Sequence, residues 1–162
     1  MYSIRLDGDV RKLMKKLSKL GSIELKEANL VLAETLRTST KQRFREQKSP
    51  EGKAWKTSIR AEQEGGATLS DTAGLKNSIK SKATQDGFAV GTNKIYARTH
   101  QFGEPGRVIR AKTPKGLRFK VSGNWVNKKK VIVSIPSRPY LGISEDDMNE
   151  IRSTVLDMIS ED

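Results

Sequence analysis

The stretch KSKATQDGFAVG, residues 80–91, places Asp86-Gly87 between two short segments, residues 80–84 and 88–91. An Asp-Gly pair favours a tight turn between antiparallel strands, because glycine adopts positive φ without strain. These residues therefore predict a β-hairpin near the middle of a chain of 162 residues. The hairpin argues against an all-helical fold.

Helical periodicity is present on both sides of this hairpin. Residues from Val10 to Leu20 and from Ile23 to Glu46 carry apolar side chains three and four positions apart, with Gly21 between the two predicted helices. A last helix is predicted to begin at Ser144, with Asp147 three positions on as a variant of the capping box. Its predicted buried stripe is Met148, Ile151, Val155, Met158 and Ile159.

Polar connections separate these elements. Residues 49–68 are rich in polar side chains and glycine, which predicts a loop. Ser70 and Asp71 are expected to cap a short helix that contains Leu75 and Ile79.

The second half of the chain has strand character after a short turn or helix at residues 96–102. Val108–Ala111, Leu117–Val121 and Val131–Ile135 alternate apolar and polar residues, which predicts a three-stranded meander. Lys128-Lys129-Lys130 is expected in a connecting turn of this basic β arm, about residues 107–130.

These patterns together predict one α+β domain over residues 1–162. We expect a small antiparallel sheet of about four or five strands, flanked by N-terminal helices over about residues 10–46 and by the C-terminal helix. The chain has no cysteine and no apolar run long enough to cross a membrane, so we expect a soluble, cytoplasmic protein without disulfides or a membrane span.

The net charge of +12 is unevenly distributed. Residues 101–140 contain ten lysines and arginines against one acidic residue, whereas residues 141–162 contain one against seven. Three interpretations remain open for this pattern: binding of nucleic acid, complementary contacts between copies of the chain, or two faces that are simply solvated.

No catalytic, metal or cofactor signature occurs in the sequence, so an enzyme is not expected. His100 is the only histidine, and a structural hydrogen bond is the favoured interpretation of it. The alternative is a catalytic role of His100 in a small hydrolase, because the members of a catalytic triad come together in space and not in sequence. Asp146-Asp147 lies at a predicted helix start, where capping explains both acids.

Two tryptophans occur in polar surroundings. Trp55 is expected to anchor its loop on the core, although burial by a partner is the alternative. Trp125 lies in the lysine-rich arm, where a partner is an equally good explanation. With Phe119 it also fits, loosely, a single-stranded nucleic-acid platform, but Phe119 is on the apolar face of its strand.

Four segments, in order, resemble the phage virion-morphogenesis family, the tail-completion proteins of Mu-like and P2-like tailed phages. They are residues 43–56, ending in Pro50-Glu51-Gly52-Lys53-Ala54-Trp55-Lys56; residues 69–79, with Ala73 as an extra residue; residues 90–103, ending in Tyr96-Ala97-Arg98-Thr99-His100-Gln101-Phe102-Gly103; and residues 135–144, with Arg138-Pro139-Tyr140-Leu141-Gly142.

The resemblance implies a structural virion protein of the head–tail junction, forming a ring, expected to be a hexamer, beside neck, connector and tail-tube proteins. Contact with DNA in the channel is a further expectation, and the protein is expected in the host cytoplasm during assembly. The uneven charge adds the hypothesis that the acidic helix, Ser144–Asp162, meets a basic surface of an adjacent subunit or ring. The scaffold residues of these motifs are Tyr96, His100, Gln101, Phe102, Gly103, Pro139, Tyr140 and Leu141. The residues hypothesised to meet partners are Trp55, Trp125, Lys128, Lys129, Lys130, Arg138, Asp146, Asp147 and Glu150.

Overall fold

The computed structural model describes residues 2–5, 10, 12, 14–15, 25–121 and 123–160. Its helices are α2 (Leu25–Glu46), α3 (Ile59–Glu64), α4 (Gly74–Asn77), α5 (Ala97–Phe102) and α6 (Glu145–Ser160). Its strands are β1 (Tyr2–Arg5), β2 (Lys80–Thr84), β3 (Gly87–Thr92), β4 (Glu104–Arg110), β5 (Leu117–Val121), β6 (Asn124–Lys128) and β7 (Lys130–Ile135). The predicted α+β class is confirmed, although the strands form three small sheets in place of one.

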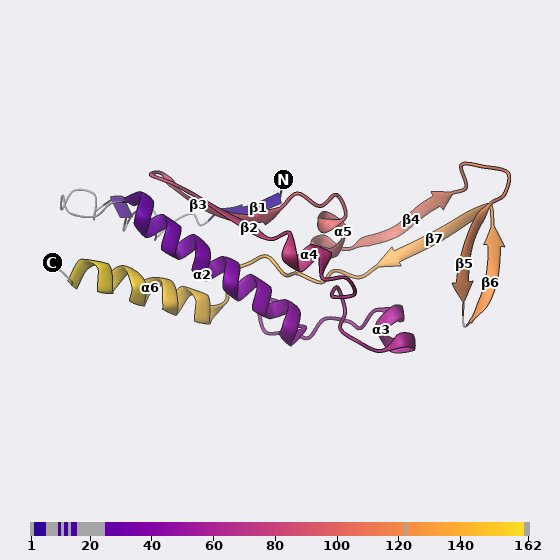
Figure 1. The fold of residues 1–162 in the computed structure, drawn as a ribbon, viewed down its shortest axis with the longest axis horizontal. Helices are drawn as coiled ribbons and strands as arrows, with labels where there is room; N and C mark the ends of the chain where they lie inside the picture. The colour runs from indigo at the N-terminus through magenta and orange to yellow at the C-terminus, as the bar shows by residue number, and fades with distance from the viewer. Residues whose placement is uncertain are drawn as a thin grey trace.

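The body of the protein consists of a sheet, the long helix α2 and the C-terminal helix α6 (Figure 1). The sheet has the order β1-β3-β2 and is antiparallel throughout. The predicted hairpin is present, with Thr84 opposite Gly87 and Lys80 opposite Gly91. Helix α2 packs against β2 and β3 and also contacts α6, so it joins the sheet to the last helix.

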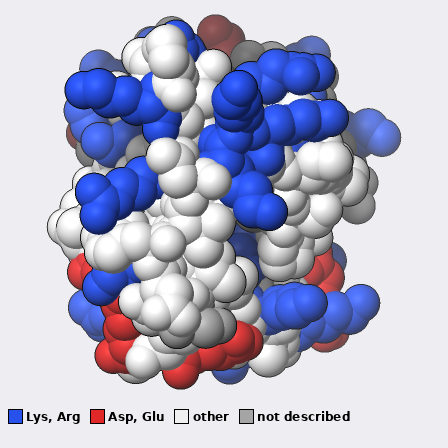
Figure 2. All heavy atoms as spheres, turned by 90° about the vertical axis from the view of Figure 1, so that its right-hand side faces the viewer, with Lys and Arg blue, Asp and Glu red and all other residues white. Residues whose placement is uncertain are grey.

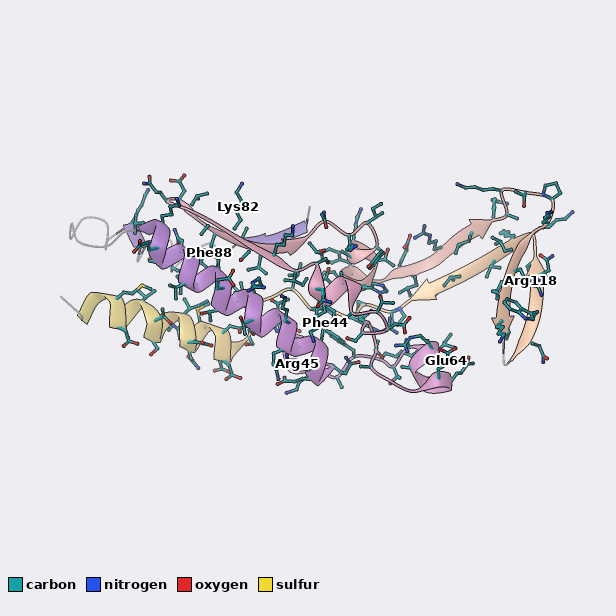
Figure 3. All side chains as sticks on the ribbon, in the orientation of Figure 1. Phe44, Arg45, Glu64, Lys82, Phe88 and Arg118 are labelled. Carbon is teal, nitrogen blue, oxygen red and sulfur yellow. The ribbon has the colours of Figure 1, made fainter. Side chains whose placement is uncertain are left out.

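Helix α2 forms because its apolar residues recur three and four positions apart and meet the sheet. Ala28, Leu32 and Leu36 are buried along this stripe, and each large aliphatic side chain buried in this way contributes about 1.5–3 kcal/mol. Figure 3 shows Phe44 toward the C-terminal end of α2 and Phe88 on the neighbouring hairpin. Both phenylalanines belong to the same core cluster as Tyr140 and Ile151.

The capping box predicted for the last helix is confirmed. The backbone N–H of Ser144 donates to the carboxylate of Asp147 at 2.7 Å, and the N–H of Asp147 donates to the Ser144 hydroxyl at 3.1 Å. Ile151 and Val155 are buried as the predicted stripe requires. The side chain of Ile159, also in that stripe, lies outside the described residues.

The predicted basic arm is present but is built differently from the predicted meander. β4 pairs with β7 and β5 pairs with β6, so the arm consists of two antiparallel ribbons. The β4–β7 ribbon projects from the body, and the β5–β6 ribbon lies across its far end (Figure 1). Strand β6 was not predicted, because Asn124, Asn127 and Lys128 give it no alternation of apolar residues. The lysine run does not form a whole turn, since Lys128 ends β6, Lys129 links the strands and Lys130 begins β7.

The region predicted as a loop contains a helix. Ser58 caps α3 by accepting a hydrogen bond from the N–H of Ala61 at 3.2 Å. The expected caps Ser70 and Asp71 are not used, because α4 begins after Ala73, which makes no side-chain capping bond. Ile79 lies beyond the end of α4.

The N-terminal predictions are tested only in part. The predicted helix from Val10 to Leu20 falls mostly outside the described residues, but Val10, Lys12, Met14 and Lys15 have helical backbone. Val10 and Met14 pack against the core. Strand β1, which pairs with β3, was not predicted.

Candidate functional site

The arm is attached to the body at a corner formed by residues 137–142, and Arg43 is the side chain that holds this corner to α2. The Arg43 guanidinium donates to the carbonyls of Tyr140 at 3.0 Å and Gly142 at 2.8 Å. It also pairs with the carboxylate of Asp147, and the two side chains are only 6% and 3% exposed. Burial lowers the pKa of Arg43, and the charge of Asp147 opposes that effect. One buried ion pair thus ties the end of α2 to the start of α6.

Three aromatic rings pack beside this ion pair. The ring of Phe44 lies 5.4 Å from that of Trp55 and 5.3 Å from that of Tyr140, measured between centroids. Trp55 Nε1 donates to the carbonyl of Pro139 at 2.9 Å. Burial, with a smaller effect of Tyr96, raises the pKa of Tyr140 to about 12. The predicted anchoring of the Trp55 loop on the core is confirmed.

Helix α5 is joined to the same corner through Gln101 and Arg138. The Gln101 side-chain oxygen accepts from the N–H groups of Tyr140 and Leu141, both at 3.0 Å, and its amide donates to the Leu141 carbonyl at 2.8 Å. The N–H of Arg138 donates to the His100 carbonyl at 2.7 Å, while its guanidinium donates to the Lys56 carbonyl at 2.7 Å. The corner is therefore held by hydrogen bonds from three separate segments of the chain.

Gly103 allows this close approach. It has a φ of 76°, and a Cβ added there would lie 2.8 Å from the backbone nitrogen of Ser137 and 3.0 Å from the carbonyl oxygen of Ile135. Since α5 ends at Phe102 and β4 starts at Glu104, Gly103 is the point where the arm leaves the body.

His100 lies at this corner and is half-buried. Its ring meets that of Tyr96 edge-on, with centroids 5.9 Å apart. Burial, followed by the charge of Arg138, lowers the pKa of His100 from its ordinary value of 6.5. Among the described residues Nδ1 has no hydrogen-bond partner, so the predicted structural hydrogen bond is not formed at that atom.

The β4–β7 ribbon presents apolar and basic side chains together to solvent. Val108 is opposite Ile132 and Arg110 is opposite Lys130, and these two pairs share one face because they are two residues apart. All four side chains are exposed, Ile132 to 62%. This face is a cross-strand apolar pair bordered by two positive charges.

The β5–β6 ribbon carries the most exposed aromatic side chain of the arm. Trp125 is 59% exposed and is opposite Lys120 in the register. The Arg118 guanidinium lies 4.5 Å from the Trp125 ring centroid and the Lys120 ammonium 5.5 Å from it, both within cation–π range. Figure 3 shows Arg118 on this ribbon, and Figure 2 shows basic side chains gathered on the end of the molecule that carries the arm.

The structure separates the residues hypothesised to meet partners into two groups. The first group is exposed, and its role in partner contacts stays a prediction; it consists of Trp125, Lys128, Lys129, Lys130, Asp146 and Glu150. Trp55, Arg138 and Asp147 are buried by contacts within this chain, which corrects their assignment to a partner surface. The sequence pattern missed Arg43, although it lies seven residues after Leu36, on the buried stripe of α2.

The phage virion morphogenesis family matches residues 7–160, which is nearly the whole chain. The chain belongs to this family. It is also 30% identical over 162 residues to the "Putative capsid assembly protein G" of Escherichia phage Mu, covering 94% of this chain and 91% of that protein.

This member of the virion morphogenesis family therefore has a structural or assembly role in a phage particle. No solved structure matches it. No helix among the described residues is long and apolar enough to cross a membrane, and no group of acidic or histidine side chains in that part of the chain is arranged to hold a metal ion.

Proposed function

We propose that this protein is a ring-forming structural subunit of the head–tail junction, which completes the tail and allows head and tail to join. Membership of the virion morphogenesis family supports a role in building the particle. The name of the phage Mu relative associates that protein with capsid assembly, which agrees with a role at the junction between head and tail.

The observation that carries the proposal is the projecting arm on its fixed corner. An isolated two-stranded ribbon is marginally stable in water, and both ribbons of this arm leave large apolar side chains exposed, among them Val108, Ile132 and Trp125. Such a surface suits burial by another protein in an assembly. In this proposal the body holds the arm in a fixed position, and the arm provides the surface that contacts another protein.

The proposed partners are further copies of the chain, in a ring expected to be hexameric, and the neck, connector and tail-tube proteins on either side of it. The mechanism is assembly by surface complementarity, without turnover of a substrate. The protein is expected in the mature particle at the junction.

Imaging of particles made without this protein tests the proposal. We expect negative-stain micrographs of a phage lacking the gene to show filled heads and separate tails. Supplying the wild-type chain from a plasmid should restore joined particles. Normal, infectious virions in the absence of the protein would overturn the proposal.

A variant with a shortened arm tests in the same assay whether β5 and β6 are needed for head–tail joining. Replacing residues 111–129 by Asn-Gly removes β5 and β6 and closes β4 and β7 with a two-residue turn at the point where Arg110 is opposite Lys130. The core cluster lies outside the removed segment, so this variant should fold. We expect it to fail to restore joined particles.

Binding of phage DNA is the second candidate function, because Trp125 between Arg118 and Lys120 is an exposed ring beside two cations. Fluorescence anisotropy with labelled single-stranded and double-stranded DNA tests it. A DNA-binding protein would show affinity that falls steeply with salt, and replacing Lys128, Lys129 and Lys130 by alanine would reduce that dependence.

A further inference from the structure

The arm and the outer face of α6 carry opposite charges that are not neutralised within the chain. Residues 104–135 contain nine lysines and arginines and one acidic residue, Glu104, which pairs with Arg107. On α6, Glu145, Asp146 and Glu150 are exposed. Within the described part of the chain, neither these three carboxylates nor the other eight basic residues of the arm form an ion pair.

These two surfaces cannot meet within one molecule, because the arm projects away from the end of the body opposite to the one where α6 ends (Figure 1). A contact between them must therefore join two copies. Such a contact uses different patches on the two partners, and repetition of a contact of this type produces a ring when the rotation closes.

Apolar complementarity accompanies the charge. Leu156 is 62% exposed on α6, and it lies 11 residues, or about three turns, after Glu145, so both are on the same face of the helix. Trp125 is the matching exposed apolar residue on the arm. The distance from Glu145 to Leu156 along α6 is about 16 Å, and strand β5 is about 14 Å long. The ribbon and the helix face are therefore similar in length.

We propose that the β5–β6 ribbon of one copy docks on the exposed face of α6 in a neighbouring copy, with Trp125 as its apolar anchor and Arg118 and Lys120 facing the acidic residues. This inference rests on the proposed ring and identifies the surfaces that build it. Pairing of one arm with another arm is disfavoured, because it would place nine basic residues opposite nine.

Charge reversal on each surface tests the docking. One variant carries Arg118→Glu and Lys120→Glu, and the other carries Asp146→Lys and Glu150→Lys. Sedimentation velocity at low salt should show association of the wild-type chain and monomers for each variant alone. An equimolar mixture should associate again, because at each contact the side chains at positions 118 and 120 then face side chains of opposite charge at positions 146 and 150. For the same reason the combined four-site variant should associate by itself.

Matched controls separate this contact from a general effect of charge. The double reversal Lys80→Glu and Lys82→Glu alters two exposed lysines of β2, a strand of the body, and should associate like the wild type. Figure 3 shows Lys82 on the body, away from the arm. Trp125→Ala leaves the charge unchanged and should weaken association at least about tenfold, as expected for a tryptophan at the centre of an interface. Urea unfolding of every variant verifies that the body is intact.

The outcomes are distinguishable. A wild-type chain that stays monomeric, an arm-reversed variant that associates normally, or a mixture that fails to associate although both variants are folded would each overturn the docking. DNA binding that is lost on arm reversal, with no association between chains, would assign the arm to nucleic acid. If particles still require the protein for joining while one of these results holds, the proposed function stands and only this interface is wrong.

Discussion

Replacing Asp147 by alanine should destabilise the protein more than any exposed substitution on α6. The change leaves the Arg43 guanidinium buried with two carbonyl acceptors and without its ion-pair partner. Breaking a buried ion pair in this way costs about 3–5 kcal/mol, and the lost cap of α6 adds about 1 kcal/mol. Since domains of this kind are stable by about 5–15 kcal/mol, the variant should be close to unfolding.

Urea denaturation followed by tryptophan fluorescence measures this loss. In a Trp125→Phe background Trp55 is the sole tryptophan, and it lies against Phe44 near the ion pair. Asp146→Ala is the control, because this exposed neighbour should cause little change in the free energy of unfolding. The double variant Arg43→Met and Asp147→Leu should recover much of the loss, since it leaves no buried charge without a partner. A loss below about 1 kcal/mol for Asp147→Ala would show that the pair does not hold the corner.

Three further predictions concern the same corner. Because burial lowers the pKa of His100, its imidazole binds a proton more readily in the unfolded chain than in the folded one. The free energy of unfolding should therefore fall as the pH drops below about 6.5, by at most about 1.4 kcal/mol per pH unit. In urea titrations between pH 7.5 and 5.5, His100→Asn should show a smaller fall than the wild type. Tyr140 should keep its proton until a pH of about 12, so stability should be lost as the pH rises from 10 toward 12, and Tyr140→Phe should remove the late step from an absorbance titration of the tyrosines. Gly103→Ala should lower the melting temperature, because the new methyl group would lie 2.8 Å from the backbone nitrogen of Ser137 and the residue has a positive φ. Gly52→Ala is the matched control, because Gly52 also has a positive φ but has open space around it. Equal shifts in melting temperature for both variants would contradict the steric argument.

Elements with local signals were predictable from the sequence. The hairpin over residues 80–91 follows from Asp-Gly chemistry, and α2 and α6 follow from their apolar stripes and, for α6, from its cap. Strand β6 could not be predicted in the same way, because its pairing with β5 depends on a turn at Gly123 and its own residues carry no alternating pattern.

The corner was predictable only in part, because its interactions connect residues far apart in the chain. The motifs around Gln101 and Pro139 marked two of its segments, but their hydrogen bonds are visible only when α5 and the segment after β7 lie side by side. Arg43 and Asp147 are separated by 104 residues, and each has a sufficient local explanation, as a helix-end cation and as a capping acid. That these two side chains are buried together as an ion pair depends on the tertiary packing of α2 against α6, which neither local sequence indicates.

The attachment of the arm has a consequence for the entropic cost of association. β4 begins directly after Gly103 and β7 ends at the corner fixed by Arg138, so the arm has no flexible linker at either end. Its direction relative to the body is determined before a second molecule arrives, and little orientational freedom is left to lose on contact. In the ring that we propose, the angle at this junction would encode the rotation from one subunit to the next, and with it the number of subunits that closes a circle.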